Sequence, residues 1–335
     1  MRKTLDIDTS PHIRSGSSVD VIMRNVVWAM LPVCAWAVWV FGLAALVTLA
    51  GATISCILTE HLLCKARGEA SAIGDWSVTI TGILYGLTLP PGLPLWMVVL
   101  GGVVGVGLGK FLFGGLGYNA FNPALVGRAF LQAAFPVAMT TWYAPLGAER
   151  FTTLPSSILA MPFATPVYDS ISGATPLSAM KFDGVAADSM DLLMGVTSGS
   201  TGETSAILIL LGGAYLVARN MMNWRITASI LGTVFAISGA MFLVDASAYP
   251  SPVFMLFSGG LMLGAVFMAT DMVASPMTNL GCVVYGALIG FLIVVIRLWG
   301  GMPEGVMYAI LLGNAVSPHI DQLIRPRVYG TERAR

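Results

Sequence analysis

The sequence predicts an all-α polytopic membrane protein with about ten transmembrane helices, arranged as two inverted repeats of five. Three observations support this fold class: an apolar composition, ten apolar segments of near-spanning length, and an uneven distribution of basic residues. The 335-residue chain is 56% hydrophobic and 10% charged, whereas a soluble domain carries about 25% charged residues. It has too little polar surface to face water, so lipid is its expected solvent.

The apolar segments follow one another with short links, except for one long polar stretch. A spanning helix needs about 20 mostly apolar residues, and we expect spans at 22–41, 43–64, 74–91, 93–112, 121–139, 205–220, 224–244, 252–270, 280–298 and 303–322. The chain then divides into an N-terminal segment 1–21, a first membrane repeat 22–139, an external loop 140–204, a second membrane repeat 205–322 and a tail 323–335. The apolar run that follows the polar N-terminal segment exceeds signal-peptide length, so no cleaved signal is expected.

Basic residues indicate the orientation of these spans. Ten crossings place both termini on one side, and of 17 lysines and arginines only Arg150, Lys181 and Arg297 fall on the opposite side. Cytoplasmic segments carry such an excess of basic residues. We therefore expect a multi-pass protein of the cell inner membrane with both termini cytoplasmic and the long loop on the outer face. The net charge of zero gives no bias toward nucleic acid.

The two halves share an ordered pattern of small residues, threonines and prolines. Segment 82–94 aligns with segment 264–276 at a constant offset of 182, which pairs Thr88 with Thr270. Because five spans per repeat is an odd number, the second half is expected to be inverted in the membrane. Inverted repeats are typical of transporter folds, which bind ions or substrates near the bilayer midplane between broken helices.

Prolines mark two expected helix breaks, at Leu89 to Gly92 and at Asp271 to Pro276. A proline removes a backbone donor and frees a carbonyl, and a freed group at membrane depth needs protein, water or an ion as its partner. The alternative is that these prolines only end helices at the membrane interface, and the sequence leaves both interpretations open.

Four residues are candidates for an ion path. Asp271 lies in the second expected break, Thr88 and Thr270 offer neutral oxygens at repeat-related positions, and Glu60 lies near the inner end of span two. Ionisable groups inside a membrane domain often mark such paths. Asp271 and Glu60 could equally be interfacial charges that face cytoplasmic water.

A glycine-rich segment, 110–128, joins spans four and five on the predicted cytoplasmic side. Asn119 and Asn122 offer amide groups that can read the edge of a flavin ring, and Phe121 could stack on such a ring. The same residues also predict a tight turn, with Asn122 as a helix N-cap and Pro123 at the first helical position. The two interpretations are compatible.

The long polar loop contains the most specific motif. Residues 169–177 read Asp-Ser-Ile-Ser-Gly-Ala-Thr-Pro-Leu, which resembles the acceptor motif of flavin transferases that join FMN to threonine through a phosphoester. Without the flanking residues, a run of four small residues would indicate an ordinary loop turn. Thr175 is the expected acceptor, and Thr165, Ser172 and Ser178 compete with it.

Over nearly its whole length the chain resembles the family that contains the D-type subunit of the Rnf complex and the B-type subunit of the Na⁺-translocating NADH:quinone oxidoreductase. Four segments carry the resemblance: 113–124, 169–177, 270–275 and 325–330. The short stretch before the first span favours the Rnf branch, because the other branch usually has a longer N-terminal extension. The resemblance implies a urea-transporter-like fold and a redox subunit of an ion-translocating oxidoreductase that is not active alone.

The resemblance also implies the cofactors and partners. It implies FMN bound covalently to Thr175, and possible further flavin, riboflavin or FMN, bound noncovalently in the membrane domain. Partners would be the other subunits of a complex that couples ferredoxin/NAD-type electron transfer to Na⁺ or H⁺ movement, among them a second flavin-bearing subunit. A flavin transferase would act during maturation. The residues expected to serve attachment are Asp169, Ser172, Gly173 and Ala174.

Two other functions remain open from the sequence. A small-solute channel or secondary transporter would suit the inverted repeat and would carry no flavin. A structural scaffold for a redox complex would also be colourless, and its deletion would impair assembly. The sequence shows neither an iron–sulfur ligand set nor a metal-binding motif, so any cluster is expected on a partner subunit.

Overall fold

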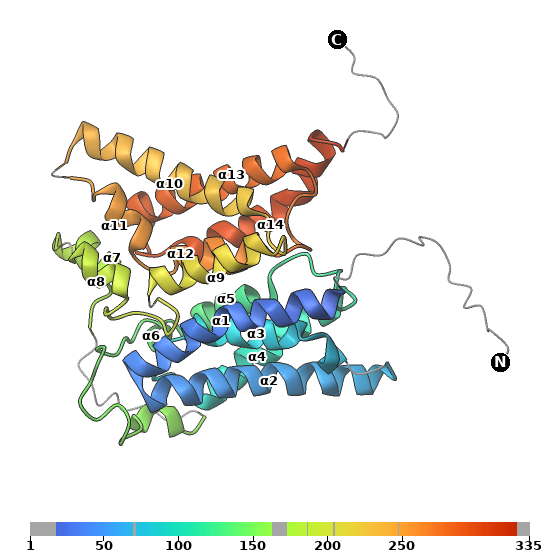
Figure 1. Ribbon diagram of the computed structural model, residues 1–335. Helices are drawn as coiled ribbons and strands as arrows, with labels where there is room; N and C mark the ends of the chain where they lie inside the picture. Colours follow the sequence, from blue (N-terminus) through green and yellow to red (C-terminus); the bar gives the residue numbers. More distant parts are fainter. Residues whose placement is uncertain are drawn as a thin grey trace, which may run out of the picture.

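The computed structural model describes residues 18–69, 72–162, 173–185, 187–203, 205–246 and 248–326, and these residues are helical or irregular. Figure 1 shows two stacked groups of helices, α1 to α6 below and α9 to α14 above. The first group consists of α1 (Val19–Phe41), α2 (Leu43–Arg67), α3 (Ser77–Leu87), α4 (Leu95–Gly109), α5 (Pro123–Ala134) and α6 (Pro136–Met139). The second consists of α9 (Ala206–Ala218), α10 (Trp224–Val244), α11 (Pro252–Phe257), α12 (Leu261–Leu263), α13 (Asn279–Trp299) and α14 (Val306–Leu323).

Short helices connect and extend these two groups. The loop between them contains η3 (Ser156–Leu159), α7 (Pro176–Ser178), the π-helical turn η4 (Ala179–Asp183) and α8 (Ser189–Met194). The other short elements are η1 (Ala72–Asp75), η2 (Phe111–Phe113) and the π-helical turn η5 (Gly264–Met268). Within the described ranges, helices thus occupy all ten predicted spans.

Five helices are long and apolar enough to cross a membrane by themselves: α1, α2, α4 with the turn that follows it (Leu95–Phe113), α10 and α13. The chain is therefore a multi-pass membrane protein. The other predicted spans contain shorter, broken or less apolar helices, such as α3 and α9. Ten crossings remain a prediction.

The helices of the two halves pack against one another in the same order. Helix α2 packs on α3 and α4, and α4 on α5; likewise α10 packs on α11 and α13, and α13 on α14. Small residues allow these close contacts, as is common between membrane helices. A Cβ added at Gly105 of α4 would lie 2.8 Å from the carbonyl oxygen of Pro123, and one at Gly290 of α13 would lie 2.8 Å from that of Ile230.

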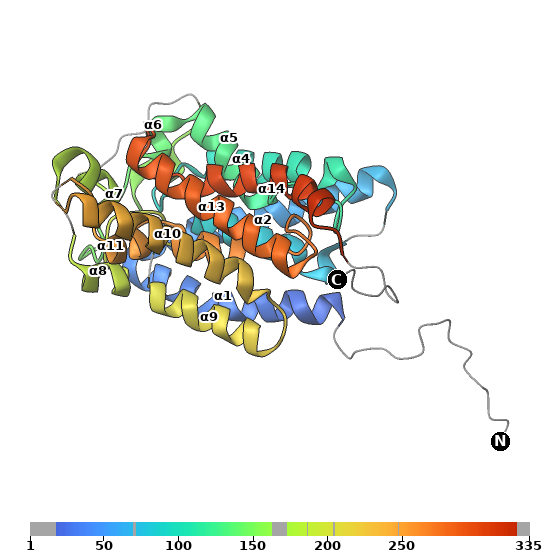
Figure 2. The same ribbon diagram turned by 90° about the horizontal axis from the view of Figure 1, so that it is seen from above.

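The start of α1 and the end of α14 lie on the same side of the molecule, and α7 and α8 lie on the opposite side in both views (Figures 1 and 2). We call the first side the terminal face and the second the loop face. The two halves meet where α1 packs on α9 and α5 on α14. The hydroxyl of Tyr215 in α9 donates to Asn25 Oδ1 in α1 at 2.6 Å, which ties the halves together.

A helix end lies where the first break was predicted. Helix α3 ends at Leu87, and residues 88–94 are non-helical and buried. Their freed carbonyls find partners across the interface: the backbone N–H of Thr201 donates to the oxygen of Leu89, and that of Gly202 to the oxygen of Leu87. Buried irregular backbone of this kind is tolerated in a membrane protein only when its polar groups are satisfied.

The second break is only partly where the sequence predicted it. Helical structure does end at Met268, just before Asp271. However, the same span is already interrupted at residues 258–260, between α11 and α12. The proline-based prediction missed this interruption because it is built on Gly259, whose φ of 66° lies in the left-handed region that glycine adopts without strain.

Candidate functional site

Two cavities at the interface between the halves contain predicted site residues. A third, more open hollow of about 560 Å³ lies between α1 and α9 and contains none of them. The loop-side cavity has a volume of about 510 Å³ and is lined by residues of the long loop, α5, α14 and the 258–260 break. The terminal-side cavity has a volume of about 120 Å³ and is lined by the start of α1, the end of α9 and the links around α5 and η5. Ligand cavities in proteins commonly measure about 300–1,000 Å³, so of these two cavities the loop-side one is large enough for an organic cofactor and the terminal-side one is not.

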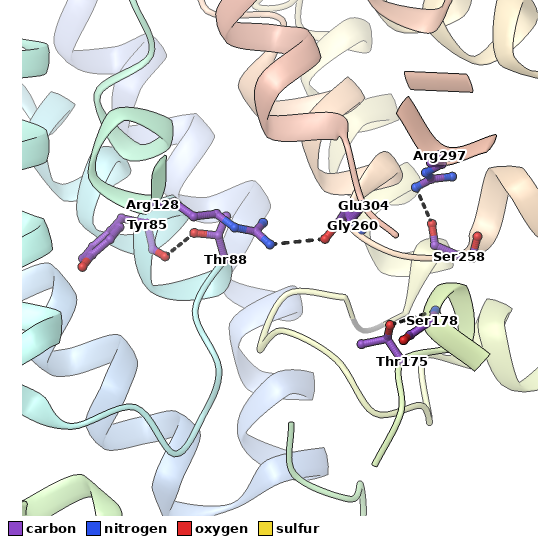
Figure 3. Close-up of polar contacts among 9 residues, drawn as sticks. All are labelled: Tyr85, Thr88, Arg128, Thr175, Ser178, Ser258, Gly260, Arg297 and Glu304. Carbon is purple, nitrogen blue, oxygen red and sulfur yellow. Dashed lines mark hydrogen bonds and ion pairs between the residues drawn. The ribbon is translucent and has the colours of Figure 1, made fainter. Parts of the chain in front are cut away.

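Thr175 lies in the wall of the loop-side cavity, beside Gly173 and Ala174. Its side chain is the N-cap of α7: Oγ1 accepts a hydrogen bond from the backbone N–H of Ser178 at 3.2 Å (Figure 3). The residue is 8% exposed, so its hydroxyl is held in a fixed direction. Asp169 and Ser172, which precede it in the predicted motif, lie outside the described residues.

Four charged side chains lie beside this cavity, and we call them the arginine–glutamate cluster: Arg128, Glu203, Arg297 and Glu304. Arg128 reaches from α5 across the interface to Glu304, with Nη2 3.2 Å from Oε2 (Figure 3). The other oxygen of Glu304 accepts the backbone N–H of Gly260 at 2.5 Å. Arg297 of α13 donates to the carbonyls of Met255 and Ser258 at 2.6 and 2.9 Å.

The cluster contains two of the residues that the charge count used, Arg128 as a cytoplasmic charge and Arg297 as an external one. Arg297 is 4% exposed, and the side chain of Arg128 is 11% exposed and faces Glu304. Both guanidinium groups are thus held within the protein, and neither can report on membrane orientation. None of the four residues was predicted to form a site. The sequence feature that could have revealed them is an ionisable side chain inside or beside an apolar segment. Such side chains mark candidate sites in membrane proteins.

Glu203 and Glu304 have different surroundings, which favour different protonation states. Burial raises the pKa of Glu203, and the nearby charge of Glu304 raises it further. Glu304 instead has Arg128 as an ion-pair partner and accepts the N–H of Gly260, so its ionised form is the better stabilised of the two. A proton that binds the pair would therefore reside on Glu203 rather than on Glu304.

The terminal-side cavity brings together residues that were predicted to have two different roles. Asn119 donates from Nδ2 to Asp271 Oδ2 at 3.1 Å, although 152 residues separate them. Asp271 Oδ1 accepts the backbone N–H of Val273. Thr270 also lines the cavity, and its hydroxyl donates to the carbonyl of Val266 at 2.5 Å. The predicted flavin-edge residue and the predicted ion-path residues are therefore direct neighbours.

Asn122 has the predicted capping role. Its Oδ1 accepts the N–H groups of Ala124 and Leu125, and its Nδ2 donates to the carbonyl of Met268 at 3.2 Å in the other half. Phe121 is not among the residues that line the terminal-side cavity. Its ring centroid instead lies 6.5 Å from that of Phe113, so stacking on a ligand in this cavity is not seen.

Thr88 and Glu60 line neither cavity. Thr88 is 1% exposed, and its hydroxyl donates to the carbonyl of Tyr85 at 2.7 Å. Glu60 forms a buried ion pair with Lys110, with Oε1 2.7 Å from Nζ, and Lys110 also donates to the hydroxyl of Ser77. Lys110 does line the terminal-side cavity, so Glu60 is connected to that cavity through Lys110.

Within the described part of the chain, no group of three or more His, Cys, Asp or Glu residues is placed to hold a metal ion. The loop-side cavity offers hydroxyl groups at Thr175 and Ser178, the Arg128 cation and the Glu203–Glu304 carboxyl pair. The terminal-side cavity offers one carboxylate and several neutral oxygens.

These features define a multi-pass membrane protein with interrupted helices and with cavities between its halves that contain a few polar and charged groups. The chain belongs to the NQR2, RnfD, RnfE family, whose model matches residues 6–330.

Its relatives are D-type subunits of ion-translocating oxidoreductase complexes. It is 39% identical over 98% of its length, and 96% of the relative, to the D-type subunit of a proton-translocating ferredoxin:NAD⁺ oxidoreductase complex from Clostridium ljungdahlii. It is 38% identical over 99% of its length, and 97% of the relative, to that of a Na⁺-translocating ferredoxin:NAD⁺ oxidoreductase complex from Acetobacterium woodii. The corresponding protein of an ion-translocating oxidoreductase complex from Alcanivorax borkumensis is 40% identical over 98% of the chain and 97% of the relative. The near-equal identity to a proton and a Na⁺ system means that overall similarity does not select the ion.

Proposed function

We propose that this protein is the D-type membrane subunit of an ion-translocating ferredoxin:NAD oxidoreductase and carries FMN covalently on Thr175. The observation that carries the proposal is the position of the Thr175 hydroxyl in the wall of a cavity of about 510 Å³, which lies within the volume range of cofactor sites. Family membership supports the redox-complex role independently.

The residues around Thr175 fit a flavin phosphoester. Arg128 supplies a cation, Gln132 an amide, and Trp142 and Tyr308 aromatic surface in the same cavity. The N–H of Gly173 donates to the carbonyl of Trp142 at 3.2 Å, which fixes the start of the attachment segment against the cavity wall. When bound, FMN would supply electron transfer in steps of one or two electrons, while the protein supplies its position and electrostatic surroundings.

Attachment is compatible with the local fold. The Thr175 oxygen serves α7 as a hydrogen-bond acceptor for Ser178 N–H, and an ester oxygen retains an acceptor lone pair. The start of α7 can therefore persist after the hydroxyl proton is replaced by a phosphoryl group. Ser178 lines the same cavity and is the nearest competing acceptor.

The orientation proposed from the basic residues makes the terminal face cytoplasmic and the loop face external in the cell inner membrane. Thr175 would then hold its flavin near the outer surface, where it exchanges electrons with a flavin-bearing partner subunit. A flavin transferase would attach it during maturation. The equivalent packing of the two halves supports the inverted five-helix repeat and the urea-transporter-like fold that the resemblance implies.

The terminal-side cavity is proposed to serve the ion. Asp271 provides a carboxylate beside the neutral side-chain oxygens of Thr270, Asn119 and Asn122, and hard cations prefer such oxygen ligands. With a volume of about 120 Å³, the cavity admits an ion with water but not a whole flavin. Asn119 and Asn122 could form hydrogen bonds to a second, noncovalent flavin, either riboflavin or FMN. Such a flavin would require this cavity to become larger.

In-gel fluorescence of the denatured protein, produced with and without a flavin transferase, tests the proposed function. We expect transferase-dependent fluorescence in the wild type and in Ser178→Ala, and none in Thr175→Ala. Fluorescence that persists in Thr175→Ala would refute the attachment site. A colourless wild type that transports a solute by itself, despite an active transferase, would favour the channel or transporter.

A further inference from the structure

The arginine–glutamate cluster contains an unusual number of unsatisfied polar atoms. Buried polar side-chain atoms are nearly always hydrogen-bonded in native proteins. Among the described residues six are not: Glu60 Oε2, Arg128 Nε, Glu203 Oε1, Ser258 Oγ, Arg297 Nε and Asn314 Nδ2. Four of the six lie in the cluster or in the 258–260 break beside it, so the protein itself leaves this region incompletely satisfied.

The 258–260 break forms a cradle for the two carboxyl groups. A Cβ added at Gly260 would lie 2.8 Å from Glu304 Oε1 and 3.9 Å from Glu203 Oε1, so both oxygens surround the same backbone point. A Cβ at Gly259 would lie 3.1 Å from Glu304 Oε1 and 3.2 Å from Arg297 Nη2. Only glycine leaves room for a carboxyl pair and an arginine this close together.

The charge of the cluster depends on a single proton. Two arginines and two ionised glutamates would have a net charge of zero, and a proton on Glu203 makes the net charge +1. Arg128 and Glu304 form the one ion pair of the cluster, and Arg297 is held by backbone carbonyls. The remaining groups that face the pair are Ser200, which can bond Glu203, Lys181, whose Nζ binds the carbonyls of the 300–302 link, and Tyr308 in the cavity wall.

Both carboxyl groups and Thr175 line the same cavity. A negative charge that enters this cavity therefore faces the same space as the pair, and electrostatic interactions inside a protein are stronger than in bulk water. The effect must be reciprocal: an added negative charge increases the affinity of the pair for a proton, and the proton increases the affinity of the cavity for the negative charge.

We infer that Glu203 and Glu304 form a redox-linked proton site, which takes up one proton from the outer aqueous side when the cavity at Thr175 gains an electron and releases it when the electron leaves. The inference rests on the proposed FMN at Thr175. The electron comes from, and returns to, redox centres of the partner subunits, and the proton binds a carboxylate oxygen of Glu203. No covalent bond other than this O–H bond forms or breaks, so charge and protons balance in each direction.

The charge of the cluster determines in which direction the midpoint potential of the flavin changes with pH. At a pH low enough to protonate the pair, Glu203 is neutral and the cluster is positive, which favours the electron. At higher pH, Glu203 is ionised, the cluster is neutral, and the midpoint potential falls as the pH rises. Glu203→Gln keeps the cluster positive at every pH, so its potential should remain at the value that the wild type reaches at low pH.

Two measurements on the full-length protein test the inference. The first is a potentiometric titration of the covalent flavin across a pH series, with the exposed carboxylate variant Glu149→Gln as control. We expect the pH dependence of the potential to be weaker in Glu203→Gln than in the wild type and unchanged in Glu149→Gln. The same pH dependence in all three proteins, with fluorescent flavin in each, would overturn the redox linkage.

The second measurement needs no flavin. An infrared titration of Thr175→Ala should show a protonated-carboxyl band that persists above the ordinary range of glutamate and disappears in Thr175→Ala/Glu203→Gln. Absence of that band from the folded Thr175→Ala protein would overturn the proton site itself. Its presence in a chain whose wild type never acquires flavin would retain the proton site and refute the proposed function instead, so the two failures are distinguishable.

Discussion

The loop-side and terminal-side cavities lie at the same interface between the halves, but their charged groups are paired to different extents. On the terminal side, Lys110 is neutralised by Glu60 at 2.7 Å, Glu60 Oε2 is the one unsatisfied atom of this pair, and Asp271 is held by two N–H donors. On the loop side, two arginines face two carboxyl groups, and several of their polar atoms are unsatisfied. A region whose charges are paired is suited to stability, whereas a region with a variable charge is suited to respond to a ligand or an electron.

Helix α5 connects the two cavities. Asn122 at its start lines the terminal-side cavity, and Arg128 lines the loop-side cavity. Six residues of α-helix span about 9 Å, so the two sites are close enough for a change at one to be felt electrostatically at the other. Substitutions on each side can therefore show whether the two cavities act separately.

Removal of the terminal-side carboxylate should have the largest effect on function. Asp271→Asn preserves the size of the side chain but removes the charge, and we expect ion uptake by vesicles that contain the complex to fall to background. The covalent flavin should remain, because Thr175 lies in the other cavity. Glu69→Gln, an exposed carboxylate change near the same face, is the control. Normal ion pumping by Asp271→Asn would refute its role.

The buried pair should have the largest effect on stability. Lys110→Met leaves Glu60 as an uncompensated buried charge, which costs about 3–5 kcal/mol of unfolding free energy. Glu60→Gln/Lys110→Met should recover most of this loss in thermal unfolding experiments. Arg67→Gln removes an exposed partner 3.7 Å from Glu69 and should cost less than about 1 kcal/mol.

The same double variant separates structure from transport. If Glu60 only neutralises Lys110, the stable double variant should still translocate ions. Transport that is lost in a protein of restored stability would instead make Glu60 part of the ion path.

The position of α5 should be sensitive to one methyl group. Gly105→Ala places a Cβ 2.8 Å from the Pro123 carbonyl, and overpacking of this kind costs about 1–3 kcal/mol. Both cavities should be disturbed, because α5 lines both. Gly107→Ala on the same helix meets no atom within 4 Å and should unfold like the wild type. Equal unfolding temperatures for the two variants would contradict this contact.

The smallest expected effect is on the link that carries Glu304. Lys181 donates to the carbonyls of Arg297, Gly300 and Met302, and burial lowers its pKa. Lys181→Gln should lose less than about 1 kcal/mol, because these bonds are only partly buried and a glutamine can still donate to the link, and this loss is confined to one link. Hydrogen exchange should report it as faster exchange in residues 300–305, with Lys65→Gln unchanged. Unaltered exchange there would show that Lys181 does not hold the link.

Features that depend on local chemistry could be predicted from the sequence. Apolar segments of spanning length indicated the positions of the helices, and Asn122 followed by Pro123 indicated the N-terminus of α5. The proline-rich stretch after Leu87 indicated the first break. Each of these depends on a few consecutive residues, so no knowledge of the tertiary structure was needed.

The arginine–glutamate cluster could not be predicted in the same way. Arg128 and Glu304 are 176 residues apart, and only the packing of α5 on α14 brings them together. The break that receives Glu304 contains no proline, so its signal was two adjacent glycines in a chain that has 38. Charge counting could not recognise the ion pair of Arg128, because a buried ion pair and a cytoplasmic anchor look alike in a sequence.

The flavin anchor can be located by tandem mass spectrometry of the peptide that contains Thr175, prepared from protein made with an active flavin transferase. We expect a mass increase equal to FMN minus water, and fragment ions that place it on Thr175. An unmodified peptide, or the same increase on Ser172 or Ser178, would contradict the assignment of Thr175 as the anchor of a flavin in the loop-side cavity.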